Sequence, residues 1–116
     1  MQSTECIFCR IIRKEIPAQI AAESEKALAF HDLNPQAPVH ILIVPKVHVE
    51  SINGLNDDLS TLLAPMTMMA QDLARKHEID QSGYRVVMNT GKDAGQSVFH
   101  LHMHLVGGRP MKWPPG

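Results

Sequence analysis

Near its C-terminal end the chain alternates histidine with aliphatic residues, and this run restricts the fold more than any other feature. The run is HLHMHLV, residues 100–106. Successive side chains of a β-strand point to opposite faces, so a strand here would carry three imidazoles on one face and Leu101, Met103 and Leu105 on the other. The aliphatic face suits a core, and the row of imidazoles, spaced about 7 Å apart along a strand, suits chemistry near neutral pH.

Three uses of this histidine row remain open from the residues alone. The imidazoles can occupy a solvated strand face, bind a metal ion, or supply a nucleophile beside a proton donor. One tetrahedral zinc ion is a poor match for all three, because residues two apart on a straight strand fan out along a line. The preceding loop, residues 91–97, contains glycines and offers backbone N–H groups to an anion. This combination favours catalysis.

The rest of the chain predicts one sheet with helices. Five short segments have the apolar and β-branched character of strands: residues 19–23, 27–31, 40–44, 84–89 and 97–106. Residues 57–77 carry Leu and Met at helical spacing, so we expect one long helix, kinked or divided at Pro65. A short amphipathic helix is expected within residues 6–16. The predicted class is α+β, a five-stranded antiparallel meander with one long helix, in a single domain over residues 1–116 with an extended tail at 109–116.

Composition excludes several kinds of partner. Lys and Arg number 11 and Asp and Glu number 12 among 116 residues, so the net charge is −1 and no basic surface for nucleic acid is expected. No membrane span is expected, because no segment approaches the roughly 18 apolar residues that a span needs. The first residues lack the basic and apolar regions of a secretory signal. We therefore expect a cytoplasmic protein whose cysteines are reduced.

Two residues separate Cys6 from Cys9, which is the spacing of one half of a zinc site. Half a zinc site, a free dithiol and a redox pair all stay open from this spacing. For redox use, the chain lacks a thioredoxin-like context.

The segment QSVFHLHMH, residues 96–104, resembles the signature of the histidine-triad superfamily. Further likeness, to its nucleotide-binding branch, lies in IIRKEIP at 11–17, AFHD at 29–32, PQAP at 35–38 and WPPG at 113–116. The resemblance implies the histidine-triad (HIT-like) fold and a homodimer in which two sheets join edge to edge. It also implies a purine nucleoside phosphoramidase that hydrolyses adenosine 5′-monophosphoramidates to AMP and an amine, with AMP, GMP and their phosphoramidates as ligands. A hydrolase is favoured over a nucleotide transferase, because His104 stands where transferring relatives carry glutamine.

The resemblance also implies roles for single residues. His102 would be the nucleophile and form a nucleotidyl-histidine, while His104 and Ser97 would protonate the leaving amine. His40 and His100 would support these catalytic groups. Asp32 would accept hydrogen bonds from the ribose hydroxyls. The other nucleotide contacts expected are Phe30, His31, Leu33 and Ile43 around the nucleoside, Asn89, Gly95 and Gln96 near the phosphate, and Trp113 from the partner subunit.

In some histidine-triad proteins, positions matching His48 and His100 complete a Cys2His2 zinc site with two cysteines such as Cys6 and Cys9. Such an ion would be structural and would clamp the N-terminal helix to the sheet, so catalysis would require no cofactor. Two other classes of function stay open: a nucleotide-binding regulator or scaffold whose hydrolysis is incidental, and a zinc-storage or zinc-sensing protein.

Overall fold

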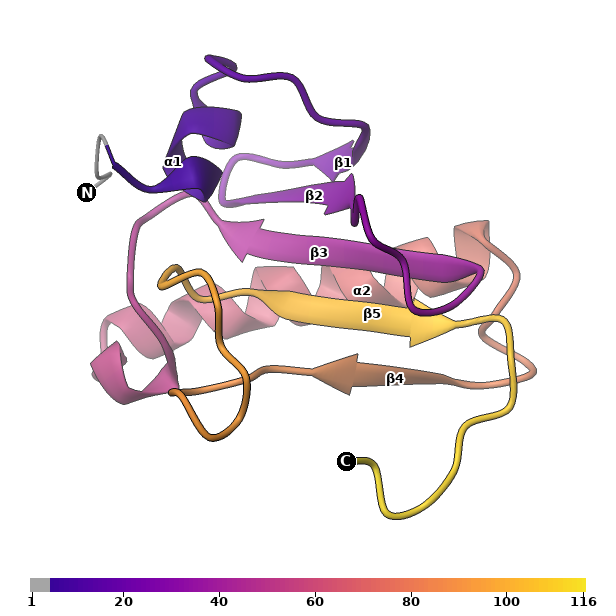
Figure 1. Cartoon of the computed structure of the whole chain (residues 1–116). Helices are drawn as coiled ribbons and strands as arrows, with labels where there is room; N and C mark the ends of the chain where they lie inside the picture. Colours follow the sequence, from indigo (N-terminus) through magenta and orange to yellow (C-terminus); the bar gives the residue numbers. More distant parts are fainter. Residues whose placement is uncertain (1–4) are drawn as a thin grey trace.

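The computed structural model describes residues 5–116, and in it one five-stranded antiparallel sheet lies between helices α1 and α2 (Figure 1). The strands are β1 (Ile20–Glu23), β2 (Ala27–His31), β3 (Val39–Pro45), β4 (Tyr84–Val87) and β5 (Met103–Gly107). The helices are α1 (Ile7–Ile12) and α2 (Leu63–Lys76), and two 3-10 turns, η1 (Ile52–Gly54) and η2 (Leu59–Leu62), connect β3 to α2. The expected α+β class, with five antiparallel strands and one long helix, is confirmed. No helix among residues 5–116 is long and apolar enough to cross a bilayer.

The strand order β1-β2-β3-β5-β4 departs from the expected meander at one place. β5 lies between β3 and β4, so His40 is paired with Val106. After β3 the chain crosses one face of the sheet through α2 and returns one strand position further away, which leaves a gap for β5 (Figure 1). The strand that carries His104 is therefore hydrogen-bonded on both sides within the sheet.

Alternation along β2 and β3 divides the apolar side chains between two cores. Ile41 and Ile43 face α2 and belong to the same buried cluster as Met66. Phe30 and Leu42 point to the opposite face and pack in the cluster that contains the buried residues of α1. Because both of its faces are covered, β3 is apolar almost throughout.

The helix expected over residues 57–77 is divided, but before Leu63 rather than at Pro65. The first part of that range is the 3-10 turn η2, and α2 begins only at Leu63. Pro65 therefore lies in the first turn of α2, where a backbone N–H has no partner within the helix and its absence costs little.

Candidate active site

The three histidines of the run do not share one strand. β5 begins at Met103, so only His104 belongs to it, and the strand expected over residues 97–106 is wrong in its first half. There the Leu101 N–H donates to the carbonyl of Val49 at 2.7 Å, outside the sheet. The alternation itself persists, because the aliphatic residues of the run are buried in the core beneath α2.

His102 is oriented as a nucleophile requires. Its Nδ1–H donates to the backbone carbonyl of His100 at 2.6 Å, which leaves Nε2 of the neutral ring with a free lone pair. The ring is 7% exposed and packs edge to face on Phe8, with 5.1 Å between ring centroids. Burial lowers the pKa of His102, while the hydrogen bond to His100 and the Asp32 carboxylate oppose that shift. The imidazole is therefore neutral at pH 7.

A chain of hydrogen bonds sets the tautomer of His104. The Gln36 N–H donates to Nδ1 of His40 at 3.0 Å, so neutral His40 carries its proton on Nε2. That Nε2–H donates to Nδ1 of His104 at 2.9 Å. The proton of neutral His104 consequently sits on Nε2. Burial lowers the pKa of His104 to about 4, and His102 and His40 add to the shift.

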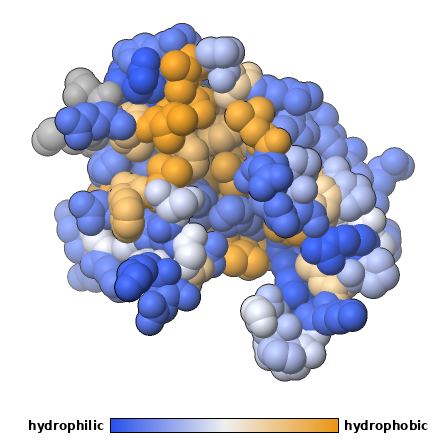
Figure 2. Space-filling model, in the orientation of Figure 1, coloured by the Kyte–Doolittle hydropathy of each residue, from blue (hydrophilic) through white to orange (hydrophobic). Residues whose placement is uncertain are grey.

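A cavity of about 240 Å³ opens beside these two imidazoles on the face of the sheet that carries α1. Figure 2 shows hydrophobic side chains gathered on this side of the molecule, next to hydrophilic ones. The cavity is lined by Phe8, Pro17, Ala18, Gln19, Phe30, His31, Asp32, Leu33, Leu42, Ser97, Val98, His102 and His104. An apolar slot with a few polar groups at one end is the usual form of a small-ligand site.

Ile43 does not line this cavity, and Leu42 lies there instead. Ile43 is fully buried on the α2 side, whereas Leu42 lines the cavity. The expectation for Ile43 is wrong by one residue, and on a strand one residue exchanges the two faces. His31 borders the cavity, but its ring packs against that of His77 with centroids 5.7 Å apart.

Asp32 stands where β2 ends, at the rim of the cavity. Its Oδ1 accepts the N–H of Asn34 at 2.7 Å, and its Oδ2 lies 3.5 Å from Nε2 of His40. A carboxylate has about four acceptor positions, so capacity for a ligand remains. Leu33, next in the chain, is 98% exposed and forms a rim of the cavity rather than a buried wall.

The side chain of Gln96 holds in place the loop that precedes the histidine run. Its Oε1 accepts the Gly91 N–H at 2.9 Å, and its Nε2 donates to the carbonyls of Glu50 and Val98. The amide is buried, so Gln96 shapes the loop rather than presenting its side chain to a ligand.

Two backbone N–H groups of this loop are used within the loop. Gly95 donates to Lys92 at 3.0 Å, and Gln96 donates to Gly91 at 3.1 Å. Gly95 has a φ of +84°, a conformation that favours glycine. These two N–H groups therefore stabilise the turn itself, and Ser97, the residue after the turn, lines the cavity.

Two further expected residues, Asn89 and Trp113, are not among the lining residues of the cavity. Asn89 is half-buried in the segment after β4, and Trp113 is 83% exposed in the tail. Neither lines the cavity in the single chain. The expectation for Trp113 concerns a partner subunit.

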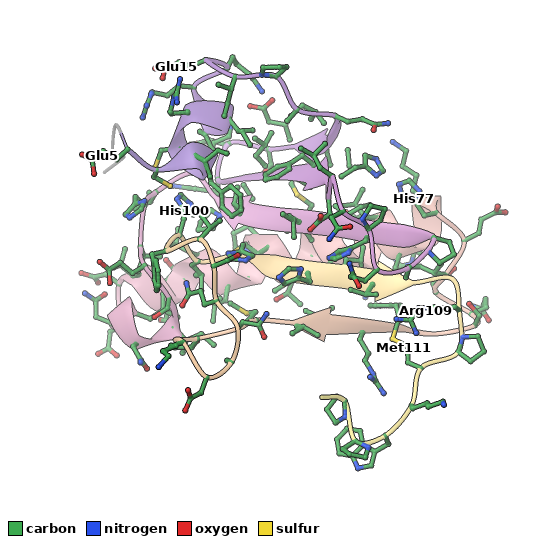
Figure 3. The ribbon with its side chains drawn as sticks, viewed as in Figure 1. Glu5, Glu15, His77, His100, Arg109 and Met111 are labelled. Carbon is green, nitrogen blue, oxygen red and sulfur yellow. The ribbon has the colours of Figure 1, made fainter. Side chains whose placement is uncertain are left out.

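The four expected metal ligands come together at the end of β3, beneath α1, where Figure 3 labels His100. The Sγ atoms of Cys6 and Cys9 and one ring nitrogen each of His48 and His100 lie within 4.8 Å of one another. Nδ1 of His100 is 3.3 Å from Sγ of Cys6 and 3.1 Å from Nδ1 of His48. Tetrahedral zinc, with bonds near 2.0 Å to nitrogen and 2.3 Å to sulfur, separates its ligands by about 3.3–3.8 Å.

The hydrogen bond of His100 also suits a metal ligand. Its Nε2–H donates to the carbonyl of Pro45 at 2.9 Å, so Nδ1 carries the lone pair. Burial lowers the pKa of His100 to about 4, which keeps the ring neutral as ligation requires. The donor set therefore fits zinc.

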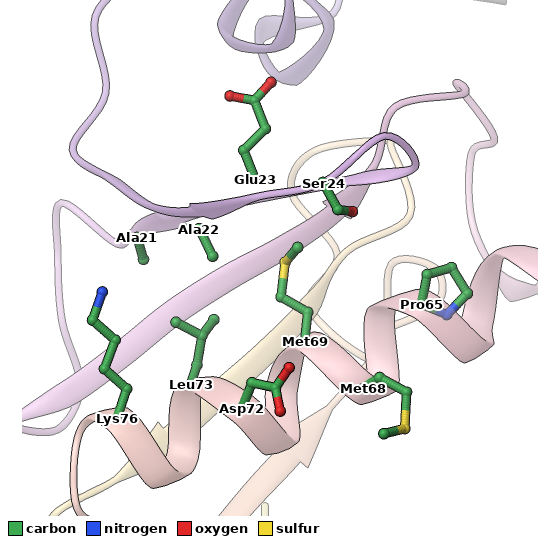
Figure 4. A pocket seen from close by; sticks show the side chains of 10 residues that line it. All are labelled: Ala21, Ala22, Glu23, Ser24, Pro65, Met68, Met69, Asp72, Leu73 and Lys76. Carbon is green, nitrogen blue, oxygen red and sulfur yellow. The ribbon is translucent and has the colours of Figure 1, made fainter.

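A second concave surface, of about 440 Å³, lies between β1 and α2 (Figure 4). Methionine, alanine and leucine side chains make up much of it, and no imidazole or thiol is among its lining residues. It offers no nucleophile of the kind found on the α1 face, so we place the chemistry at the histidine cavity.

A family model, described as HIT domain, matches residues 13–111 of the chain. The chain belongs to the HIT family. It is 43% identical over 107 residues to the purine nucleoside phosphoramidase of Escherichia coli, covering 92% of this chain and 90% of that protein. It is 45% identical over 112 residues to an uncharacterised HIT-like protein of Synechocystis, covering 97% of each. A HIT family hydrolase from Legionella pneumophila has the same fold, with a TM-score of 0.94, 49% identity and coverage of 97% of this chain and 100% of that one. These findings identify a HIT-family hydrolase.

Sequence reasoning missed six residues of the cavity wall: Phe8, Pro17, Ala18, Gln19, Leu42 and Val98. Phe8 stands between the two cysteines in the sequence. The spacing does contain a signal, because cysteines that share one ion fix the first turn of α1 and hence the direction of the residues between them. No signal in β3 distinguished Leu42 from Ile43, because both faces of that strand are apolar.

Proposed function

We propose that this HIT-family hydrolase is a purine nucleoside phosphoramidase that converts adenosine 5′-monophosphoramidates to AMP and an amine. The observation that carries the proposal is the neutral His102, whose Nε2 is unprotonated beside a cavity of nucleoside size. The 43% identity to a protein named purine nucleoside phosphoramidase supports the same substrate class.

In the first step, Nε2 of His102 attacks the phosphorus, and the P–N bond to the amine breaks. The amine leaves with the electron pair of that bond and takes up a proton, relayed from solvent by the Ser97 hydroxyl or by the Nε2–H of His104. The ring of His102 becomes positively charged as the N–P bond forms, and the His100 carbonyl that accepts its Nδ1–H stabilises this charge.

In the second step, water attacks the phosphorus and the N–P bond to His102 breaks, which restores the free imidazole and releases AMP. Water loses a proton here, which balances the proton taken up by the amine. Because His104 is neutral and its proton is on Nε2, it donates to a phosphate oxygen or to the leaving nitrogen. Asp32 accepts from the ribose hydroxyls, and Phe8, Phe30 and Leu42 hold the base.

We propose that Cys6, Cys9, His48 and His100 hold a structural zinc ion, which when bound would cross-link α1 to the strand ends. None of the steps at phosphorus needs a cofactor in this scheme. The bound molecules in this proposal are thus the zinc ion and the purine nucleotide.

We propose that the protein acts as a single-domain cytoplasmic homodimer. Among residues 5–116, β4 pairs with β5 alone, so one of its edges has no strand partner there, and Tyr84 and Val86 on it are partly exposed. A second copy pairing there would join the sheets edge to edge. Trp113 in the tail would then approach the partner's cavity near the leaving group.

The test uses an adenosine phosphoramidate and follows free amine and AMP. His102→Ala should lower turnover by about 10³-fold or more while AMP binding is kept, and rapid quenching of the wild type should trap an adenylated His102. The matched control is His77→Ala, which removes an imidazole that does not line the cavity; its ring packs on His31 at the rim, so KM can change slightly while the turnover number stays near that of the wild type. An adduct on another residue, or turnover that survives His102→Ala, refutes the proposal. Binding of the nucleotide without turnover in the wild type would favour the alternative function, a nucleotide-binding regulator or scaffold.

A further inference from the structure

His100 belongs to two sets of contacts at once. Its side chain approaches Cys6 and His48 through Nδ1 and is tied to Pro45 through Nε2. Its backbone carbonyl is the acceptor, at 2.6 Å, that keeps the proton of His102 on Nδ1. The residue that closes the metal cluster thus also holds the nucleophile in its reactive tautomer.

Phe8 makes a second connection between the cluster and the nucleophile. It lies between Cys6 and Cys9 in the first turn of α1, and the Sγ of Cys6 accepts the N–H of Cys9 at 3.4 Å. Its buried ring lies 5.9 Å from that of His100 and 5.1 Å from that of His102, edge to face in both cases. Cysteines that share an ion would therefore also fix the ring that packs on His102.

The cluster is also reached through a second cavity, which is separate from the nucleotide cavity. A cavity of about 430 Å³ reaches Cys6 and His48 and has Glu5 and Glu50 among its lining residues. Cys6 and His48 are only partly buried. The segment 97–98 lines this cavity and the nucleotide cavity alike. A metal ion thus has a route to the cluster that is flanked by carboxylates, and only a short stretch of chain separates it from the substrate.

We propose that binding of a zinc-type divalent ion to Cys6, Cys9, His48 and His100 controls turnover at His102, in addition to any contribution to stability. This inference rests on the proposed phosphoramidase function. The ion acts through the position of the His100 carbonyl and of the Phe8 ring, and takes no part in the reaction at phosphorus. His100 and Phe8 are positioning residues in this scheme.

The experiment compares the zinc-loaded protein with protein stripped by a chelator, with metal content and folding measured on both. Misplacement of a reactive group by about 1 Å costs on the order of 100-fold, so we expect turnover to fall by about 10- to 100-fold and to return when one equivalent of Zn²⁺ is added. Cys6→Ser, which leaves three ligands, should show the same loss and should not recover at one equivalent of Zn²⁺, only at a higher concentration that fills the weaker site. Ile7→Ala, an exposed change in the same turn that keeps all four ligands, is the matched control and should behave as wild type.

A second readout needs no substrate. Nitrogen NMR of His102 shows which ring nitrogen carries the proton, and we expect Nδ1–H alone in the loaded protein and a mixture of tautomers in the stripped protein. A folded, stripped protein that turns over at the loaded rate and keeps a single tautomer overturns the inference. If the loaded protein cleaves no phosphoramidate, the proposed function fails, yet the tautomer comparison still decides whether the cluster controls His102.

Should the stripped protein unfold, His48→Gln supplies the test, because three ligands retain a weaker site. Turnover per folded molecule should then rise with zinc occupancy. A turnover per folded molecule that stays constant across the titration overturns the inference.

Discussion

Shortening Leu42 and Ile43 to alanine should separate substrate binding from stability. The two residues are neighbours on β3 and both are aliphatic, but Leu42 lines the cavity and Ile43 packs with the residues of α2. Each substitution removes three carbons, so the pair differs chiefly in the face of the sheet that it alters.

The expected magnitudes follow from burial. Loss of the Leu42 contacts with a bound nucleoside should weaken binding by about 1–2 kcal/mol, or about 5- to 30-fold in KM, at roughly 0.8 kcal/mol per CH2 group. Ile43 is 0% exposed, so Ile43→Ala should leave KM nearly unchanged and lower the free energy of unfolding by about 2–5 kcal/mol. Leu42→Ala should also destabilise, because Leu42 belongs to the cluster beneath α1.

Three proteins are compared: the wild type, Leu42→Ala and Ile43→Ala. For each, the assay measures KM for an adenosine phosphoramidate, the dissociation constant of AMP by calorimetry, and urea unfolding. All kinetics are run at a temperature where each variant is folded. If Ile43→Ala raised KM as much as Leu42→Ala does, the assignment of faces along β3 would be refuted, and with it the location of the base slot.

Three other predictions concern acid, the loop and the surface. The pKa of His104 is about 4 in the folded protein and near 6.5 in the unfolded chain, so between these pH values only the unfolded chain binds a proton at this residue. The neutral His104 therefore contributes to the free energy of unfolding above pH 6.5, and this contribution is lost as the pH falls toward 4. It amounts to about 1–3 kcal/mol after allowance for partial exposure. Urea unfolding of wild type and His104→Gln across this range checks it, since the variant should show a flatter profile. Gln96→Ala leaves the Gly91 N–H and the Glu50 carbonyl without their partner. It should lower the free energy of unfolding by about 2–3 kcal/mol and also lower turnover, which thermal unfolding and kinetics will measure. Unchanged turnover would argue against a role for the loop in catalysis. Glu23 pairs with two lysines at the surface, and Glu23→Gln should leave the melting temperature almost unchanged because exposed ion pairs contribute little.

The strands were predicted well where the residue types within the segment determine its backbone conformation. The strand expected over residues 27–31 is β2 as observed, and the one expected over 40–44 is extended only by Val39 and Pro45. The failures involve contacts distant in the chain. The segment before Met103 leaves the sheet because the Leu101 N–H bonds to a loop, and nothing within the segment indicates this.

In the site too, features set by neighbouring residues were predicted, and features set by residues distant in the chain were not. Alternation in the histidine run correctly predicted that its aliphatic residues would be core. Which face of β3 met the ligand was beyond prediction, because burial on both sides removes the polar alternation that marks a face. The spacing of Cys6 and Cys9 predicted half of a metal site, and its partners His48 and His100 came only from the family resemblance, since they lie 42 or more residues from the first cysteine.

The insertion of β5 between β3 and β4 has a consequence for synthesis on the ribosome. β5 is the last strand to emerge, and until it does, β3 and β4 have no partner in the middle of the sheet. A nascent chain that already includes β4 exposes two open strand edges, the kind of surface that pairs with other chains. Chaperone binding should therefore be strongest between the emergence of residue 87 and that of residue 107, and a ribosome stalled in this window would hold a chain without His104 in place.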